Sequence, residues 1–173
     1  RPVPLLDIRT TERAVVAAAL APSLAAADWL PHAVAASLLA RVAPANPLLP
    51  ALASGERRIV LIDAAAHGLD MAAGLSGTAT LVPGGSDATH ALVLGDSAVL
   101  LVDIGAQGAP TTPRAMLDGT ESADIAFALP AGAGEVIATG AAAAALAELG
   151  RDTLYAGRCA EACGLMERMM QDT

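Results

Sequence analysis

Hydrophobic and polar positions in the middle of this chain follow a pattern typical of β-strands. Between residues 56 and 130, short apolar runs are separated by Gly, Pro, Asp and Ser, which is typical of strands joined by tight turns. Gly95-Asp96 between two such runs predicts an antiparallel hairpin. Strands that follow one another without helices favour a small antiparallel barrel or sandwich. We predict about six strands, at residues 58–63, 78–82, 91–94, 98–102, 112–117 and 123–129.

The segments before and after this region have patterns typical of helices instead. Ala- and Val-rich stretches at residues 13–20, 23–30 and 32–42 predict helices broken by prolines, and a last short turn at 51–54 ends at Gly55. Residues 139–173 predict one long helix, in which Gly157 costs about 1 kcal/mol if it is interior. Its apolar-to-small face is predicted at Ala142, Leu146, Leu149, Thr153, Ala156, Ala160, Cys163 and Met170.

These patterns together predict an α+β fold in three parts. Residues 1–55 form a helical segment, residues 56–130 a β-domain, and residues 131–173 a linker followed by the first helix of a C-terminal bundle. Because the apolar face of that helix continues to its last turn, we expect partner helices that the chain itself does not supply. Since the chain begins at Arg1 rather than Met, we also expect it to be processed or truncated.

Composition excludes several classes of function. The chain has a net charge of −8, all ten cationic side chains are arginines, and only 2% of residues are aromatic. Nucleic-acid binding needs a basic stripe or stacking rings, so we expect no nucleic-acid partner. No apolar stretch reaches the roughly 20 residues that span a bilayer, so we expect no membrane insertion. Two cysteines without a disulfide scaffold fit a reducing compartment, and we expect a cytoplasmic location.

Single residues give weak signals for a site. Cys159 and Cys163 lack a second ligand pair, so we expect small buried side chains and no metal site. We expect His32 to be solvated and His90 to lie at a strand edge. Gly84-Gly85-Ser86-Asp87 is interpreted as a strand connection, with a phosphate-binding loop as the alternative, and Arg114 as an ordinary solvated side chain.

Several segments, in their order, resemble the acyl-CoA dehydrogenase family. Ala51 to Ile62 (A-L-A-S-G-E-R-R-I-V-L-I) is similar to the family's entry into its first middle-domain strand. Gly74-Leu75-Ser76-Gly77-Thr78 is similar to its g-x-L-x-G-t-K hairpin, with Ala79 where Lys is usual. Residues 1–6, 117–127 and 141–173 are similar to an early helix, the last strands and the first bundle helix.

The resemblance implies FAD as the cofactor and an acyl-CoA thioester as the substrate. The implied reaction is α,β-desaturation in lipid or sterol catabolism, by a homo- or hetero-oligomer with another acyl-CoA dehydrogenase chain. The implied flavin-facing strand is Leu81, Val82 and Pro83, at the positions of the family's W-x-T/S. The family's catalytic carboxylate would lie beyond Thr173, so the resemblance assigns no catalytic residue here.

The chain departs from the family at two flavin motifs. Where members that bind FAD have T-E-P-x-x-G-S-D after the first strand, this chain has Ala64-Ala65-Ala66-His67-Gly68-Leu69-Asp70. Pro83 has neither an amide hydrogen nor a hydroxyl group. The main hypothesis is an acyl-CoA dehydrogenase. These departures argue against FAD binding by this chain and support the alternative, a non-catalytic partner subunit of a heteromeric acyl-CoA dehydrogenase. A third hypothesis is an unrelated small β-barrel that binds an acidic or apolar ligand.

Overall fold

The computed structural model describes residues 15–16, 18–19, 29–117 and 119–173. Predictions for residues 1–14 and 20–28, and for Ala17 and Asp118, lie outside the described residues. Residues 15–16 and 18–19 are helical, and the helices whose bounds are described are α2 (Trp29–Val42), α3 (Leu49–Ser54) and α4 (Gly140–Gln171), with a 3-10 turn, η3, at Gly85–Asp87. The strands are β1 (Ile59–Asp63), β2 (Gly74–Pro83), β3 (His90–Leu94), β4 (Ala98–Asp103), β5 (Thr111–Ala115), β6 (Glu121–Pro130) and β7 (Glu135–Thr139).

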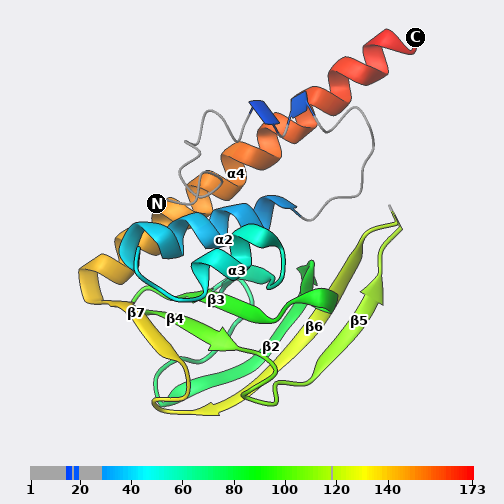
Figure 1. Cartoon of the computed structure of the whole chain (residues 1–173). Helices are drawn as coiled ribbons and strands as arrows, with labels where there is room; N and C mark the ends of the chain where they lie inside the picture. The colour runs from blue at the N-terminus through cyan, green and yellow to red at the C-terminus, as the bar shows by residue number, and fades with distance from the viewer. Residues whose placement is uncertain (1–14, 17, 20–28, 118) are drawn as a thin grey trace.

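The described strands form two sheets, which are stacked beneath the helices (Figure 1). One sheet has the order β1-β3-β4-β7 and the other has the order β2-β6-β5. The predicted hairpin at Gly95-Asp96 is confirmed, because β3 and β4 pair antiparallel. The prediction of an α+β sandwich is therefore confirmed, and in the described residues the sheets do not close into a barrel.

Two details of the strand prediction were wrong. β1 and β3 pair in parallel, because β2 lies between them in sequence but joins the other sheet. The strand β7 was missed, because V-I-A at its centre is too short an apolar run to stand out beside the long helix that follows. β7 pairs with β4 and is the edge strand of the first sheet on that side.

Strands β1, β3 and β4 of the first sheet have buried residues on both faces, which explains their nearly continuous apolar sequences, whereas β7 at the edge is largely exposed. On β3, Leu92 and Leu94 face the cluster formed with α2, α3 and α4, while Ala91 and Val93 face the second sheet. This alternation follows from the two-residue period of a strand. The fold is thus three layers deep: helices, the four-stranded sheet and the three-stranded sheet.

Helix α4 buries a different face from the one predicted. Leu146 and Thr153 are buried as expected, but Ala142, Ala156, Cys163 and Met170 are exposed. Cys159 is exposed as well, so the prediction of two buried cysteines was wrong. The reason is that glycines lie on the packed side, where they let other segments approach closely. The buried positions are Ala143, Leu146, Ala147, Gly150, Thr153, Gly157 and Gly164.

Candidate functional site

The candidate site lies where strand β2 reaches residues 81–83. The pairing of β2 with β6 shifts register between Ala79 and Val82, which is the signature of a β-bulge. At this bulge Leu81 has φ 52°, and its side chain is 50% exposed. Val82 is buried and Pro83 is half-buried. A left-handed leucine costs roughly 1–2 kcal/mol, so other contacts must hold it in place.

The contact that holds Leu81 is a carboxylate on the neighbouring strand. The backbone N–H of Leu81 donates to Oδ1 of Asp124 on β6 at 2.9 Å. Arg114 on β5 contacts the other oxygen, with Nε at 2.8 Å and Nη2 at 2.7 Å from Oδ2. Two hydrogen bonds lower the pKa of the Asp124 carboxyl group: the larger effect comes from the amide of Leu81 and the next from Arg114. Arg114 is therefore an ion-pair partner rather than only a solvated side chain.

Three backbone positions at and just after the end of β2, Leu81, Pro83 and Gly84, offer no free donor. The N–H of Leu81 is bound by Asp124, Pro83 has no N–H, and the N–H of Gly84 donates to the carbonyl oxygen of Glu121 at 3.2 Å. The following residues, Gly85–Asp87, form the turn η3, in which Ser86 Oγ donates to the carbonyl oxygen of Ser122. This segment connects β2 to β3, in agreement with its interpretation as a strand connection.

A hollow of about 530 Å³ lies beside the end of β2, between the sheets and the start of α2. Gly84, Trp29 and His32 contribute to its lining. Its charged groups are Arg58, Asp87 and Glu121, and Arg58 lies 3.7 Å from Asp87. Two carboxylates against one guanidinium disfavour a diphosphate, which needs an excess of positive charge or free amides.

His32 is half-buried and both of its ring nitrogens contact the backbone, so the prediction that it is solvated was wrong. Its Nδ1 accepts the N–H of Ile59 at 3.2 Å, and its Nε2 lies 3.3 Å from the carbonyl oxygen of Leu52. The imidazole thus joins α2 to α3 and β1. Burial lowers the pKa of His32, because the charged form loses solvation. A neutral ring with Nε2 protonated satisfies both contacts.

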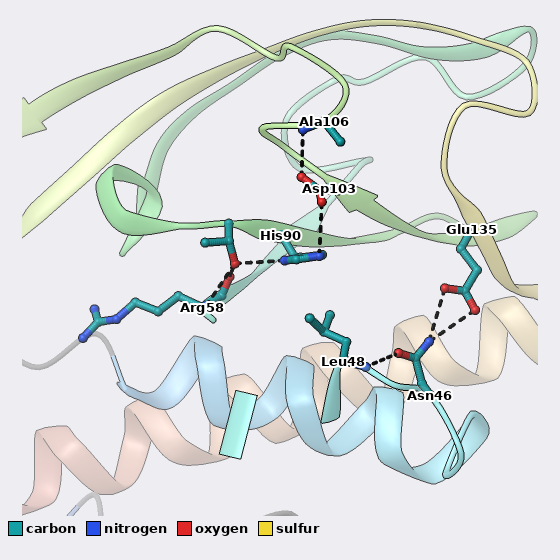
Figure 2. Close-up of polar contacts among 8 residues, drawn as sticks. Asn46, Leu48, Arg58, His90, Asp103, Ala106 and Glu135 are labelled. Carbon is teal, nitrogen blue, oxygen red and sulfur yellow. Dashed lines mark hydrogen bonds and ion pairs between the residues drawn. The ribbon is translucent and has the colours of Figure 1, made fainter. Parts of the chain in front are cut away.

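His90 lies at the edge of β3, as predicted, within a small polar network (Figure 2). Its Nδ1 is 2.9 Å from Thr89 Oγ1, and its Nε2 is 3.7 Å from Oδ2 of Asp103. The Thr89 hydroxyl donates to the carbonyl oxygen of Arg58 at 2.8 Å. Although a hydroxyl, an imidazole and a carboxylate adjoin here, the hydroxyl hydrogen is used by the backbone, so Thr89 is not activated as a nucleophile. The network joins β1 to β3.

Two further polar contacts position the helices on the first sheet. Asn46, which lies between α2 and α3, donates from Nδ2 to both carboxylate oxygens of Glu135 on β7 at 3.2 Å (Figure 2). Arg151 on α4 contacts Asp63 at 3.3 Å and Asp96 at 3.4 Å. Asp63 ends β1, where the family's T-E-P-x-x-G-S-D loop would begin, and its carboxylate is paired with a helix.

The residues at β2 do not fit FAD, the cofactor that the resemblance implies. The ring nitrogens and carbonyl oxygens of a flavin need hydrogen-bond donors from the protein. Leu81, Pro83 and Gly84 offer no free amide hydrogen, and a carboxylate occupies the donor of Leu81. We therefore assign no chemical step to a flavin in this chain. The described residues also hold no group of three or more His, Cys, Asp or Glu side chains suited to a metal ion.

No signal in the sequence indicated Asp124 as a part of this site. It lies 43 residues after Leu81, and only the pairing of β2 with β6 brings the two together.

No helix in the described residues is both long enough and apolar enough to span a bilayer. No protein-family model and no curated protein sequence matches the chain.

Solved structures do match. The ChsE4-ChsE5 complex from Mycobacterium tuberculosis is 27% identical with a TM-score of 0.74, and the match covers 94% of this chain and 48% of that one. A variant of the steroid ACAD Tcur3481-Tcur3483 is 25% identical with a TM-score of 0.68, covering 90% of this chain and 47% of that one.

The likeness extends to a more distant enzyme, the butyryl-CoA dehydrogenase of Megasphaera elsdenii. It is 16% identical with a TM-score of 0.73, and the match covers 94% of this chain and 51% of that one. In all three comparisons this chain spans about half the length of the solved structure. Over that half, the chain has the fold of the acyl-CoA dehydrogenases.

Proposed function

We propose that this chain is a non-catalytic subunit of a heteromeric acyl-CoA dehydrogenase, in which a partner chain holds the flavin. The observation that favours this function is the lack of free amide donors at Leu81 and Pro83 on strand β2. The amide of Leu81 is bound by Asp124 and Pro83 has no amide hydrogen, so this strand offers little to an isoalloxazine ring. The fold itself remains suitable for packing within such an assembly.

The similar structures support an assembly of two different chains. The structure at 27% identity is the complex of ChsE4 with ChsE5, and the one at 25% identity combines Tcur3481 with Tcur3483. The second of these is described as a steroid ACAD. We propose that the assembly containing this chain acts on an acyl-CoA in lipid or sterol catabolism, in the cytoplasm.

Co-expression tests this function directly. The tagged chain is produced alone and together with an acyl-CoA dehydrogenase chain that has intact T-E-P-x-x-G-S-D and W-x-T/S motifs. We expect a stable complex whose flavin absorbance is bleached by acyl-CoA, and a colourless protein when the chain is produced alone. Tight FAD binding and acyl-CoA oxidation by the single chain would overturn the proposal.

A second candidate function is FAD-dependent α,β-desaturation by this chain itself. It is favoured by the extent of the match, which covers 94% of the chain against butyryl-CoA dehydrogenase. In that reaction a carboxylate removes the α-proton and polarising hydrogen bonds stabilise the enolate. The spectrum of the singly produced chain separates the two candidates, because only this one predicts a yellow protein.

A further inference from the structure

Leu81 is the one non-glycine residue with a positive φ in the part of the chain that the structure describes. A leucine does not adopt this conformation without support, because its Cβ then crowds the following carbonyl group. Strained backbone of this kind persists only where the surrounding structure imposes it, and it clusters at ligand-binding sites. The groups that impose this conformation on Leu81 therefore bear on whether strand β2 is open to a ligand.

The support comes from all three strands of the second sheet. Leu81 lies on β2, Asp124 on β6 and Arg114 on β5, and these strands are neighbours in the order β2-β6-β5. The two carboxylate oxygens of Asp124 have separate partners: Oδ1 accepts the amide of Leu81, and Oδ2 accepts Nε and Nη2 of Arg114. The Asp124 side chain is only 17% exposed, so it is held within the sheet surface.

The two contacts of Arg114 determine where the carboxylate points. A guanidinium that places two N–H groups on one carboxylate oxygen restricts the rotation of that carboxylate, since both charge-assisted hydrogen bonds weaken if it turns. The remaining oxygen of Asp124 then faces the amide of Leu81 at 2.9 Å. A charged acceptor makes a stronger hydrogen bond than a neutral carbonyl, so an outside acceptor would have to displace it at a cost.

We infer that the Arg114–Asp124 pair is an internal substitute for a cofactor at strand β2: it binds the amide of Leu81 and closes this strand to FAD. This inference deepens the proposed function and rests on it for the interpretation of β2 as the flavin-facing strand. Leu81, Asp124 and Arg114 form one unit, in which Asp124 is the acceptor and Arg114 is a positioning residue.

Hydrogen exchange of the Leu81 amide tests the inference on the 173-residue chain. We expect this amide to be protected in the wild-type chain, and added FAD to leave the exchange of residues 81–84 unchanged. Asp124→Ala should speed exchange at Leu81 by about tenfold, the effect of losing one charged hydrogen bond. Asp70→Ala is the matched control, because Asp70 Oδ1 likewise accepts a nearby loop amide, that of Ala72 at 2.8 Å. It should leave Leu81 exchange unchanged.

Two results would overturn the inference. One is protection of residues 81–84 by FAD in the wild-type chain, a measurement that needs no variant and so does not depend on whether Asp124→Ala folds. The other is a folded Asp124→Ala chain in which Leu81 exchanges at the wild-type rate. Both differ from a failure of the proposed function, which would appear as the absence of a stable complex with a motif-complete partner while Leu81 exchange keeps its expected pattern.

Discussion

Gly157 on α4 lies directly against the side chain of Leu30 on α2. A Cβ atom at Gly157 would be 2.7 Å from both Cδ1 and Cδ2 of Leu30, which is closer than real side chains approach. One heptad earlier, a Cβ atom at Gly150 would lie 2.8 Å from a methyl group of Leu94 and 2.9 Å from one of Leu38. These glycines let α4 pack closely against α2 and the first sheet, an advantage that offsets their low helix propensity.

Filling this contact should destabilise the fold. Gly157→Leu forces a side chain into the space of Leu30, which is fully buried, and we expect the free energy of unfolding to fall by about 2–3 kcal/mol. The adjacent Ala156 is exposed, so Ala156→Leu is the matched control and should change stability by less than about 0.5 kcal/mol. Urea unfolding measures both. Equal stabilities for the two variants would show that α2 and α4 do not meet at this point.

Relieving the backbone at the bulge should stabilise it. Leu81→Gly removes the Cβ that makes a left-handed conformation unfavourable, and we expect stability to rise by up to about 1 kcal/mol. The same change at Ser76, an exposed residue of β2 without a positive φ, should lower stability by about 0.5–1 kcal/mol. Thermal unfolding distinguishes them, and a loss of stability in both variants would contradict a left-handed Leu81.

Acid should weaken the junction of α2, α3 and β1 through His32. Burial lowers the folded-state pKa of this imidazole below its unfolded value, so the unfolded chain takes up the proton first. The stability that neutral His32 contributes is therefore complete above the unfolded pKa, near 6.5, and is lost as the pH falls toward the lower folded value.

Unfolding experiments between about pH 7 and pH 5 measure this contribution. We expect His32→Gln to reduce the loss of stability over that interval. The remainder should come partly from His90, since its pKa is lowered by burial as well. An identical pH dependence in His32→Gln and the wild-type chain would argue against a neutral, hydrogen-bonded His32.

The ion pairs of Arg151 should help to hold α4 on the first sheet. Arg151→Met keeps much of the side-chain volume but removes the contacts with Asp63 and Asp96, and we expect a loss of about 0.5–1 kcal/mol because the group is partly solvated. Arg158→Met is the matched control, since Arg158 pairs only with Glu161 of the same helix in the described contacts. It should cost less than about 0.5 kcal/mol. A larger effect at Arg158 would contradict this assignment.

Local patterns in the sequence were sufficient to predict most elements. The apolar runs marked six of the strands that the structure contains, and the Gly95-Asp96 turn marked the hairpin of β3 and β4, because a turn residue and its flanking strands are neighbours in the chain. The long helix was predicted from its periodicity, and α4 spans Gly140–Gln171. The division into three domains and the flavin-facing role of Leu81, Val82 and Pro83 stay predictions.

Tertiary structure decided which strands pair and which groups meet. Parallel pairing of β1 with β3 depends on where β2 goes, and nothing within either strand specifies it. Asp124 reaches Leu81 across 43 residues, and Arg151 reaches Asp63 across 88. The packed face of α4 follows its glycines, because close approach depends on the partner's surface as well as on the helix. Periodicity reports only the order of apolar and polar residues within one segment. A site, in contrast, is made by contacts between segments that are distant in the chain.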